Sequence, residues 1–125
     1  MRALIVDDSR AIRTIIRTIL KPLGFETFEA GHGLEALARL KEVGPVDLAL
    51  IDWNMPEMGG LDLVKALRAD TSNDGTRLMM VTTETDIGEV CKALEVGANE
   101  YLMKPFNKDL MLEKLAILGI TAGGG

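Results

Sequence analysis

Six polar side chains stand directly after short apolar runs of this sequence, and three of them are carboxylates. They are Asp7, Asp8, Asp52, Thr82, Thr83 and Lys104. Two carboxylates about 4 Å apart repel by roughly 4 kcal/mol at an effective dielectric constant of about 20, so three in one crevice need a cation. One lysine supplies too little charge, and an all-oxygen site open to water suits Mg²⁺. Beside Mg²⁺ and an ammonium, Asp52 could attack an incoming phosphoryl group as a nucleophile.

These six side chains come from distant parts of the chain, and the apolar pattern predicts the framework that unites them. Five segments have the length and composition of strands: 2–6, 25–29, 46–51, 77–81 and 100–103. Helical spacing of apolar residues follows each one. The last three helices are expected at 60–70, over about ten residues that end at Gly97, and at 108–118. Segment 71–75, "TSNDG", is expected to be a surface loop.

The first two helices have clear start and stop signals. The first begins at an Asp8 or Ser9 cap and stops at Pro22 and Gly24, and the second begins after Gly31-His32-Gly33. The residues expected to face the core are Ile12, Ile15, Ile16, Ile19 and Leu20 in the first helix, Leu34, Leu37 and Leu40 in the second, and Leu61, Val64 and Leu67 in the third. His32, the only histidine, is expected in an exposed turn and excludes Ser–His catalysis.

The alternation of strands and helices predicts an α/β fold with a doubly wound parallel sheet. Strands 2–6, 46–51 and 77–81 are continuously apolar, as strands covered by helices on both faces must be. Ligands of such sheets bind beyond the carboxyl ends of the strands. Because all parallel strands end at the same edge, the six polar side chains are expected to converge there.

Composition limits the classes of protein to consider. The chain has 125 residues, of which 47% are hydrophobic and 26% charged, and this suits one globular domain. A formal net charge of −5 argues against nucleic acid as a partner. No apolar run approaches the roughly 20 residues of a membrane span, and the N-terminus has no signal-peptide layout. We therefore expect a cytoplasmic protein without membrane contact, and the single cysteine is compatible with a reducing compartment.

Each candidate residue also has an ordinary structural explanation. Asp7 and Asp8 could serve only as helix caps, and Asp52 could form a turn by bonding its own backbone. Lys104 could be a solvated surface lysine, and Thr82 could reflect β-propensity alone. The chemical interpretation is favoured because the topology would place all of them at one edge.

Four motifs in order resemble the receiver domain of two-component response regulators, and most closely the single-domain, CheY-like chemotaxis regulators. They are "VDDS" at 6–9, "DWNMPEMGG" at 52–60, "MMVTTE" at 79–84 and "YLMKPF" at 101–106. The resemblance covers nearly the whole chain. It implies a flavodoxin-like (βα)5 fold with strand order 2-1-3-4-5, a receiver domain over 1–120 and a flexible Gly-rich tail at 121–125.

The resemblance also implies a role for each site residue. Asp52 would be the phosphoacceptor, and Mg²⁺ would be held by Asp7, Asp8, Asp52 and the backbone carbonyl of Asn54. Lys104 would pair with the phosphoryl oxygens, and its bond to Pro105 would be cis.

Four further positions would control switching and its rate. Thr82 would be the switch hydroxyl, and Tyr101 the aromatic ring that rotates inward after it moves. Asn54 and Glu84 would tune the rate of phosphoryl loss, and Thr83, which is bulkier than the small residue common in the family, would narrow access to the site.

Together these roles predict a signalling switch that accepts a phosphoryl group from a sensor histidine kinase and loses it slowly by hydrolysis. With no output domain expected in 125 residues, the signal would leave through protein contact by the face of residues 85–118 of a monomer, with the flagellar motor switch as the favoured target. Arginines on the first helix are expected to be solvated, with kinase docking as the less favoured role: Arg10, Arg13 and Arg17.

Three other functions remain as alternatives. The chain could be a phosphorelay intermediate or phosphate sink. It could be a phosphatase of the haloacid dehalogenase type, although such an enzyme is expected to carry an aspartate at position 54. A flavodoxin-like cofactor carrier is disfavoured because no Ser/Thr/Gly-rich phosphate loop follows the first strand.

Overall fold

The computed structural model describes residues 1–53, 55, 58–83 and 87–120. Its strands are β1 (Arg2–Val6), β2 (Glu26–Ala30), β3 (Leu48–Asp52), β4 (Arg77–Thr82) and β5 (Glu100–Met103). Its α-helices are α1 (Arg10–Leu20), α2 (Gly33–Val43), α3 (Gly60–Ala69), α4 (Ile87–Glu95) and α5 (Lys108–Ile117). Asn54, Glu84 and the tail at 121–125 lie outside the described residues, so the predictions for them remain predictions.

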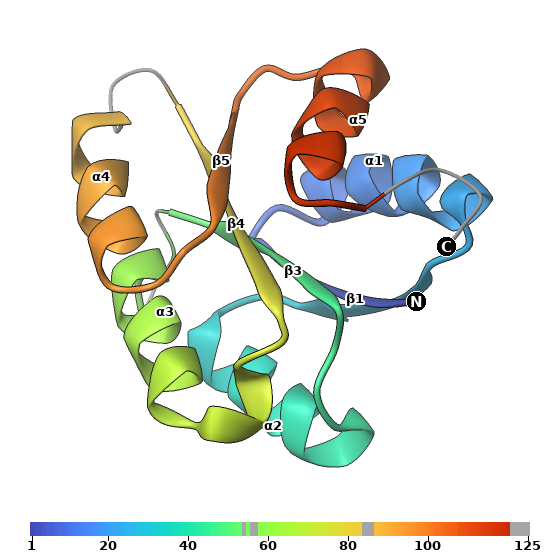
Figure 1. Cartoon of the computed structure of the whole chain (residues 1–125). Coiled ribbons are helices and arrows are strands. Elements are labelled where there is room, and N and C mark those ends of the chain that lie inside the picture. Colours follow the sequence, from blue (N-terminus) through green and yellow to red (C-terminus); the bar gives the residue numbers. More distant parts are fainter. Residues whose placement is uncertain (54, 56–57, 84–86, 121–125) are drawn as a thin grey trace.

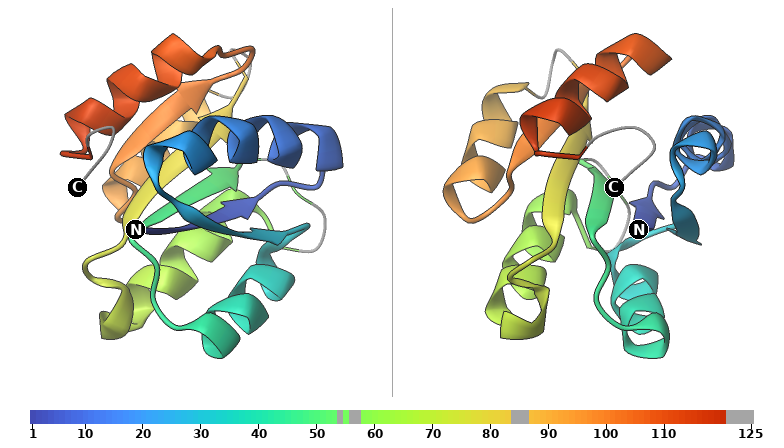
Figure 2. Two further views of the ribbon diagram at one scale, coloured as in Figure 1. Left: turned by 90° about the vertical axis from the view of Figure 1, so that its right-hand side faces the viewer. Right: turned by 45° about the vertical axis from the view of Figure 1, so that its right-hand side comes forward.

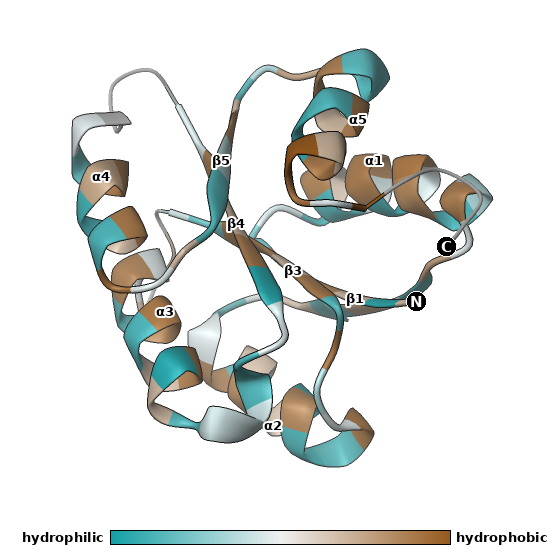
Figure 3. Cartoon of the chain, viewed as in Figure 1, coloured by the Kyte–Doolittle hydropathy of each residue, from teal (hydrophilic) through white to brown (hydrophobic). Residues whose placement is uncertain are grey.

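All five strands are parallel and lie in the order β2-β1-β3-β4-β5, which confirms the predicted fold class and strand order. Helices α1 and α5 cover one face of the sheet, and α2, α3 and α4 cover the other (Figures 1 and 2). This arrangement buries β1, β3 and β4 on both faces, which explains their unbroken apolar sequence. Figure 3 shows the resulting concentration of hydrophobic residues along the central strands.

Each central strand contributes side chains to two separate cores, because successive side chains point to opposite faces of the sheet. In β1, Leu4 and Val6 face the side of α2, α3 and α4, whereas Ala3 and Ile5 face α1 and α5. Each fully buried leucine or isoleucine contributes about 1.5–3 kcal/mol relative to an exposed one. The two cores hold the sheet rigid, and the sheet in turn fixes the positions of the residues at its carboxyl edge.

Polar side chains fix the first turn of three helices. The Oγ of Ser9 accepts a hydrogen bond from the amide of Ile12 at 3.3 Å and begins α1. His32 accepts one through Nδ1 from the amide of Glu35 at 3.2 Å, so this histidine caps α2 and is half-buried, not simply an exposed turn residue as predicted. Asn107 caps α5 in the same way.

Two apolar residues predicted to face the core lie on the surface instead. Ile15 is 46% exposed and Leu34 is 50% exposed. In α1, Ile16 and Leu20 are fully covered and Ile12 and Ile19 are partly buried against the core, so the stripe that faces the sheet is narrow.

The prediction that the arginines of α1 are solvated is correct for Arg10 and wrong for the other two. Arg13 and Arg17 both bond the carboxylate of Glu29 in the edge strand β2, at 3.1 Å and 2.9 Å. These ion pairs fasten α1 to the neighbouring strand.

Several predicted boundaries shift by one or two residues. Asp52 and Thr82 are the last residues of β3 and β4, not the first residues after them. Segment 71–75 is not a plain surface loop: Thr71–Asn73 form a 3₁₀ turn in which Asn73 is buried and donates to the carbonyl of Leu67.

The length and composition of the helices also decide whether one of them could span a membrane. Among the described residues, no helix has both the length and the apolar content that a membrane span requires.

Candidate functional site

The ends of β1 and β3 bring two aspartates together. Val6 is in register with Ile51 on the adjacent strand, so the following residues, Asp7 and Asp52, lie beside one another at the carboxyl edge. The amide of Asp7 donates to the carbonyl of Ala30 in β2 at 3.1 Å, which extends the sheet hydrogen bonding past β1. Both carboxylates are therefore placed by sheet geometry and not by a flexible loop.

Asp8 completes a cluster of three acidic side chains. Carboxylate oxygens of Asp7, Asp8 and Asp52 all lie within 4.8 Å of one another. Asp7 and Asp52 are buried, whereas Asp8 is exposed and opens the cluster to solvent. One Asp7 oxygen also accepts a hydrogen bond from the amide of Ser9 at 2.8 Å, which orients that carboxylate.

Lys104 supplies the positive charge that the sequence predicted. Its Nζ lies 3.2 Å from Oδ1 of Asp52 and 3.3 Å from Oδ2 of Asp7. The backbone amide of Lys104 donates to the carbonyl of Thr82 at 2.6 Å, and the Lys104–Pro105 bond is cis, as the family resemblance implies. The structure thus brings together four of the predicted site residues.

The electrostatics of this cluster favour a proton or a metal ion on Asp52. Burial, followed by repulsion from Asp7, raises the pKa of Asp52 to about 6, although attraction to Lys104 opposes the shift. Burial alone would lower the pKa of Lys104, but attraction to Asp52 and Asp7 and hydrogen bonds to both outweigh it and raise that pKa. Lys104 is therefore firmly charged, yet one ammonium does not fully compensate three carboxylates.

The donor set fits a hard divalent cation. Three carboxylates within mutual reach offer oxygen ligands only, one of them solvent-exposed, and Mg²⁺ binds proteins through one or two carboxylates while keeping several waters. The residues that could hold it are Asp7, Asp8 and Asp52. Burial is the main cause of the raised pKa of Asp52, and the repulsion from Asp7 that adds to it also favours a bound cation.

The two threonines lie at the same edge but differ in exposure. Thr82 follows Val81, which is in register with Asp52, and its side chain is buried. Its hydroxyl donates to the carbonyl of Thr83 at 3.3 Å. The hydroxyl of Thr82 is thus held by a long hydrogen bond at the acidic edge, whereas Thr83 is exposed.

Tyr101 lies further from the carboxyl edge than the other candidates. It is in register with Met80, two residues before Thr82, and its half-buried ring packs against the core on the side of α3 and α4. The ring also lies under the ammonium of Lys114 from α5.

A groove that the sequence did not predict opens beside Lys104. Its volume is about 380 Å³. It is lined by Ile12, Ile15, Thr83, Lys104, Pro105 and Phe106. The exposed side chain of Ile15 forms part of the apolar wall of the groove. The groove could not be predicted from the sequence because it forms only where α1 lies next to the residues that follow β5.

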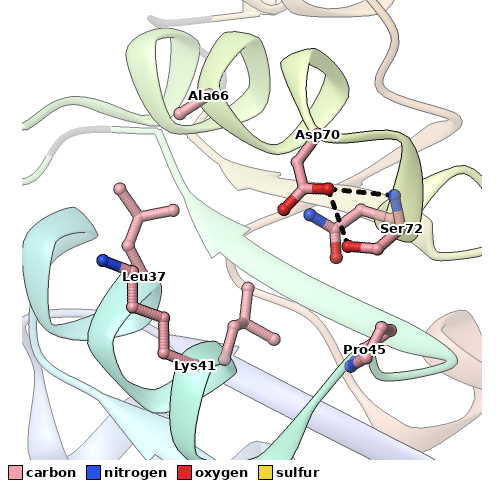
Figure 4. A pocket seen from close by; sticks show the side chains of 8 residues that line it. Leu37, Lys41, Pro45, Ala66, Asp70 and Ser72 are labelled. Atoms are coloured by element: carbon pink, nitrogen blue, oxygen red, sulfur yellow. Dashed lines mark hydrogen bonds between the residues drawn. The ribbon is translucent and has the colours of Figure 1, made fainter.

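A second cavity, of about 410 Å³, lies at the opposite edge of the sheet between α2 and α3. Figure 4 shows its lining, in which Asp70 accepts hydrogen bonds from the amide and hydroxyl of Ser72 at 3.0 Å and 2.8 Å. These bonds lower the pKa of Asp70, whose carboxylate is already used to cap the 3₁₀ turn. The acidic cluster at the carboxyl edge is therefore the candidate site.

Comparison with known proteins agrees with this geometry. Residues 3–116 match the family described as the response regulator receiver domain. Chemotaxis protein CheY1 of Helicobacter pylori J99 is 44% identical over 119 residues, which cover 94% of this chain and 96% of that protein. A CheY homolog of Campylobacter jejuni strain 81-176 is 44% identical over 127 residues and covers 100% of this chain and 98% of its own. The solved structure of Vibrio cholerae CheY4 superposes with a TM-score of 0.84 at 35% identity, over 95% of this chain and 97% of that one.

Proposed function

The chain belongs to the response regulator receiver domain family, and from that premise we propose that it is a signalling switch that takes a phosphoryl group onto Asp52. One observation carries the proposal: the buried carboxylate of Asp52 lies 3.2 Å from the ammonium of Lys104 and within 4.8 Å of two further carboxylates. Receiver domains of this family act in signalling. The identity of the phosphorylated residue, of the metal and of the partners is what we propose here.

The chemical step would be a displacement at phosphorus. An oxygen of Asp52 attacks the phosphoryl group carried by a histidine of the sensor kinase, an O–P bond forms, and the P–N bond breaks. Its electron pair returns to the imidazole, which takes a proton from solvent. Lys104 already touches Asp52 and pairs with the incoming phosphoryl oxygens, and its fixed charge favours the transition state.

Three carboxylates would hold Mg²⁺ during this step. They are Asp7, Asp8 and Asp52, with the backbone carbonyl of Asn54 as the further ligand implied by the family. The ion when bound supplies positive charge to the phosphoryl oxygens. Asp7 keeps its orientation through the amide of Ser9, and the exposure of Asp8 leaves the site open to solvent.

The switch would follow from a competition for the Thr82 hydroxyl. Before phosphorylation this hydroxyl donates to the carbonyl of Thr83. A dianionic phosphoryl group is a stronger acceptor, so Thr82 turns toward it, and the ring of Tyr101 moves into the space left behind. The face of residues 85–118 then changes its affinity for a target. Asn54, Glu84 and Thr83 would set the rate at which water removes the phosphoryl group.

The partners are proposed from the relatives and from the surface. The chain is similar to proteins named for chemotaxis, so we propose a sensor histidine kinase as phosphodonor and the flagellar motor switch as target, in the cytoplasm and with the chain as a monomer. Lys104 lines the apolar groove together with Ile12, Ile15 and Phe106, and this supports the groove as the side from which the phosphohistidine would approach.

Chemical phosphorylation tests the central claim. Incubation with acetyl phosphate and Mg²⁺ is expected to give one acid-stable, base-labile adduct, which the Asp52→Asn variant lacks. Asp62→Asn, on the exposed face of α3, is the matched control and should retain the adduct. Labelling of any other residue, or an unlabelled wild-type chain that still binds Mg²⁺, would contradict the assignment.

A further inference from the structure

A lysine of α5 reaches the edge strand β5 and contacts two of its residues. The Nζ of Lys114 lies 3.3 Å from Oε1 of Glu100 and 4.1 Å from the centre of the Tyr101 ring. The side chains of Lys114 and Glu100 are only 17% and 15% exposed, which is unusual for charged groups. We name these three residues the edge cluster.

Glu100 holds the edge cluster together through a single oxygen. Its Oε1 accepts the ammonium of Lys114 and also the backbone amide of Tyr101, the latter at 2.9 Å. The same carboxylate therefore fixes the ammonium and the backbone that carries the ring. The partly buried ion pair with Glu100 thus favours a position of the ammonium over the ring.

The ammonium sits where it stabilises one placement of the ring. A cation within about 6 Å of an aromatic centre is attracted to the face of the ring, and the attraction grows when water is excluded. Rotation of the Tyr101 side chain would remove the face from Lys114 and leave the ammonium with Glu100 alone. The contact thus opposes rotation of the Tyr101 ring away from Lys114.

We propose that Lys114 is a positioning residue whose charge holds Tyr101 in its resting placement and so sets how often the ring leaves it. Its importance for signalling rests on the proposed function, in which Tyr101 rotates after phosphorylation, whereas its effect on the ring does not. Removal of the charge should raise the population of the alternative ring placement by about two- to thirtyfold, the range that corresponds to a single cation–π contact.

The composition of the chain allows the placement of the Tyr101 ring to be measured. Tyr101 is the only tyrosine, so a chain labelled with 3-fluorotyrosine has one ¹⁹F NMR environment to report. In Lys114→Met, which keeps an unbranched side chain one atom shorter and without the charge, the signal is expected to move and to broaden or split without any phosphodonor. Lys114→Arg keeps a cation over the ring and should restore the wild-type signal.

Two more variants separate the charge from general effects. Glu100→Gln keeps an acceptor for the Tyr101 amide but frees the ammonium, so it should produce part of the Lys114→Met change. Lys108→Met makes the same substitution at an exposed position of the same helix and should leave the signal unchanged. A wild-type signal in Lys114→Met, or a Lys114→Arg signal equal to that of the methionine variant, would overturn the proposal.

A last arm of the experiment keeps this proposal distinct from the proposed function. Acetyl phosphate and Mg²⁺ should move the Tyr101 signal of the wild-type chain, and in Lys114→Met they should move it less because the ring is already partly displaced. If the wild-type signal ignores the phosphodonor, the proposed switch fails. The positioning role of Lys114, measured without phosphodonor, would stand.

Discussion

The ammonium of Lys104 lies 3.2 Å from the carboxylate of Asp52, although Asp52 ends β3, Lys104 follows β5, and β4 lies between these two strands. The two side chains meet because both residues lie at the carboxyl edge of the sheet. Each also changes the charge state of the other: Lys104 limits the rise of the Asp52 pKa, and Asp52 raises the pKa of Lys104. The phosphoryl site is in this sense one coupled ionic unit.

Loss of the Lys104 charge should destabilise the chain in a pH-dependent way. Lys104→Met leaves Asp7 and Asp52 facing one another without a cation, and breaking such a partly buried pair costs about 1–3 kcal/mol in the free energy of unfolding. The loss should be larger at pH 8, where Asp52 is ionised, than at pH 5. Urea unfolding at both values tests this, with Lys41→Met at an exposed site of α2 as control. Equal losses at the two pH values would contradict the coupling.

The raised pKa of Asp52 makes a definite prediction about stability. Between about pH 4 and pH 6 the folded chain holds a proton that the unfolded chain has lost, so the free energy of unfolding falls as pH rises through this window. A shift from 3.8 to about 6 corresponds to roughly 3 kcal/mol, present below pH 4 and lost above pH 6. Asp52→Asn lacks this loss and should gain stability relative to the wild type as pH rises.

The comparison needs Mg²⁺-free buffer, because a bound cation would relieve the same repulsion. Chelated samples unfolded by urea at pH 4, 6 and 8 give the required differences. Carboxylates away from the site are common to both chains and cancel, so the remaining difference reports Asp52 together with its neighbours Asp7 and Asp8. A constant difference between Asp52→Asn and the wild type at the three pH values would show that the carboxyl is not perturbed.

Mg²⁺ binding should follow the ionisation of Asp52. At pH 5, one unit below a pKa of about 6, only a tenth or so of Asp52 is ionised, so Mg²⁺ should bind about tenfold more weakly than at pH 8. Trp53, the only tryptophan, follows Asp52 directly and provides a fluorescence signal that EDTA should reverse. Asp8→Asn should weaken binding, and Asp62→Asn should not. An affinity for Mg²⁺ that does not change with pH would show that Asp52 is not a ligand of the metal.

Much of the site could be predicted from the sequence because topology does most of the positioning. Continuously apolar strands require helices on both sides, parallel strands share one carboxyl edge, and this alone brings Asp7, Asp52 and Lys104 together. The exact ends of the strands matter little to this argument. Asp52 is the last residue of β3 instead of the first residue beyond it, and it still reaches the cluster.

What could not be predicted depends on where side chains lie around each helix. Helical spacing marks five apolar residues on α1, but only the docked helix shows that Ile15 is left on the surface beside the groove. The spacing of Arg13 and Arg17 predicts a solvated helix face, but in the folded chain both residues form ion pairs with Glu29 of the edge strand β2. The contact of Lys114 with Tyr101 likewise needs the position of α5 on the sheet edge, which no local pattern contains.

Gly60, the first residue of α3, is packed closely against the end of β3. A Cβ atom at Gly60 would lie 2.8 Å from the methyl carbon of Met80 and 2.9 Å from the backbone oxygen of Asp52, and backbone cannot move aside. Gly60→Ala should therefore lower the free energy of unfolding by about 1–3 kcal/mol and weaken Mg²⁺ binding.

The matched control is Gly88→Ala in α4, where an added Cβ meets nothing within 4 Å. A helical glycine replaced by alanine should stabilise the chain by about 0.5–1 kcal/mol. Opposite signs for the two substitutions in parallel urea titrations are the expected result. Equal effects would show that the close contacts of Gly60 carry no cost.

Arg68 is expected to anchor the loop between α4 and β5. Its guanidinium donates four hydrogen bonds of 2.7–2.9 Å, to the carbonyls of Asn73, Thr76 and Gly97 and to Oδ1 of Asn99. Arg68→Lys keeps the charge but not the planar set of donors, so unfolding should become easier by about 1–3 kcal/mol, and amides near Gly97 should exchange faster with deuterium. Arg10→Lys, at an exposed position, is the control. Unchanged exchange near Gly97 in Arg68→Lys would show that this loop is held by its backbone alone.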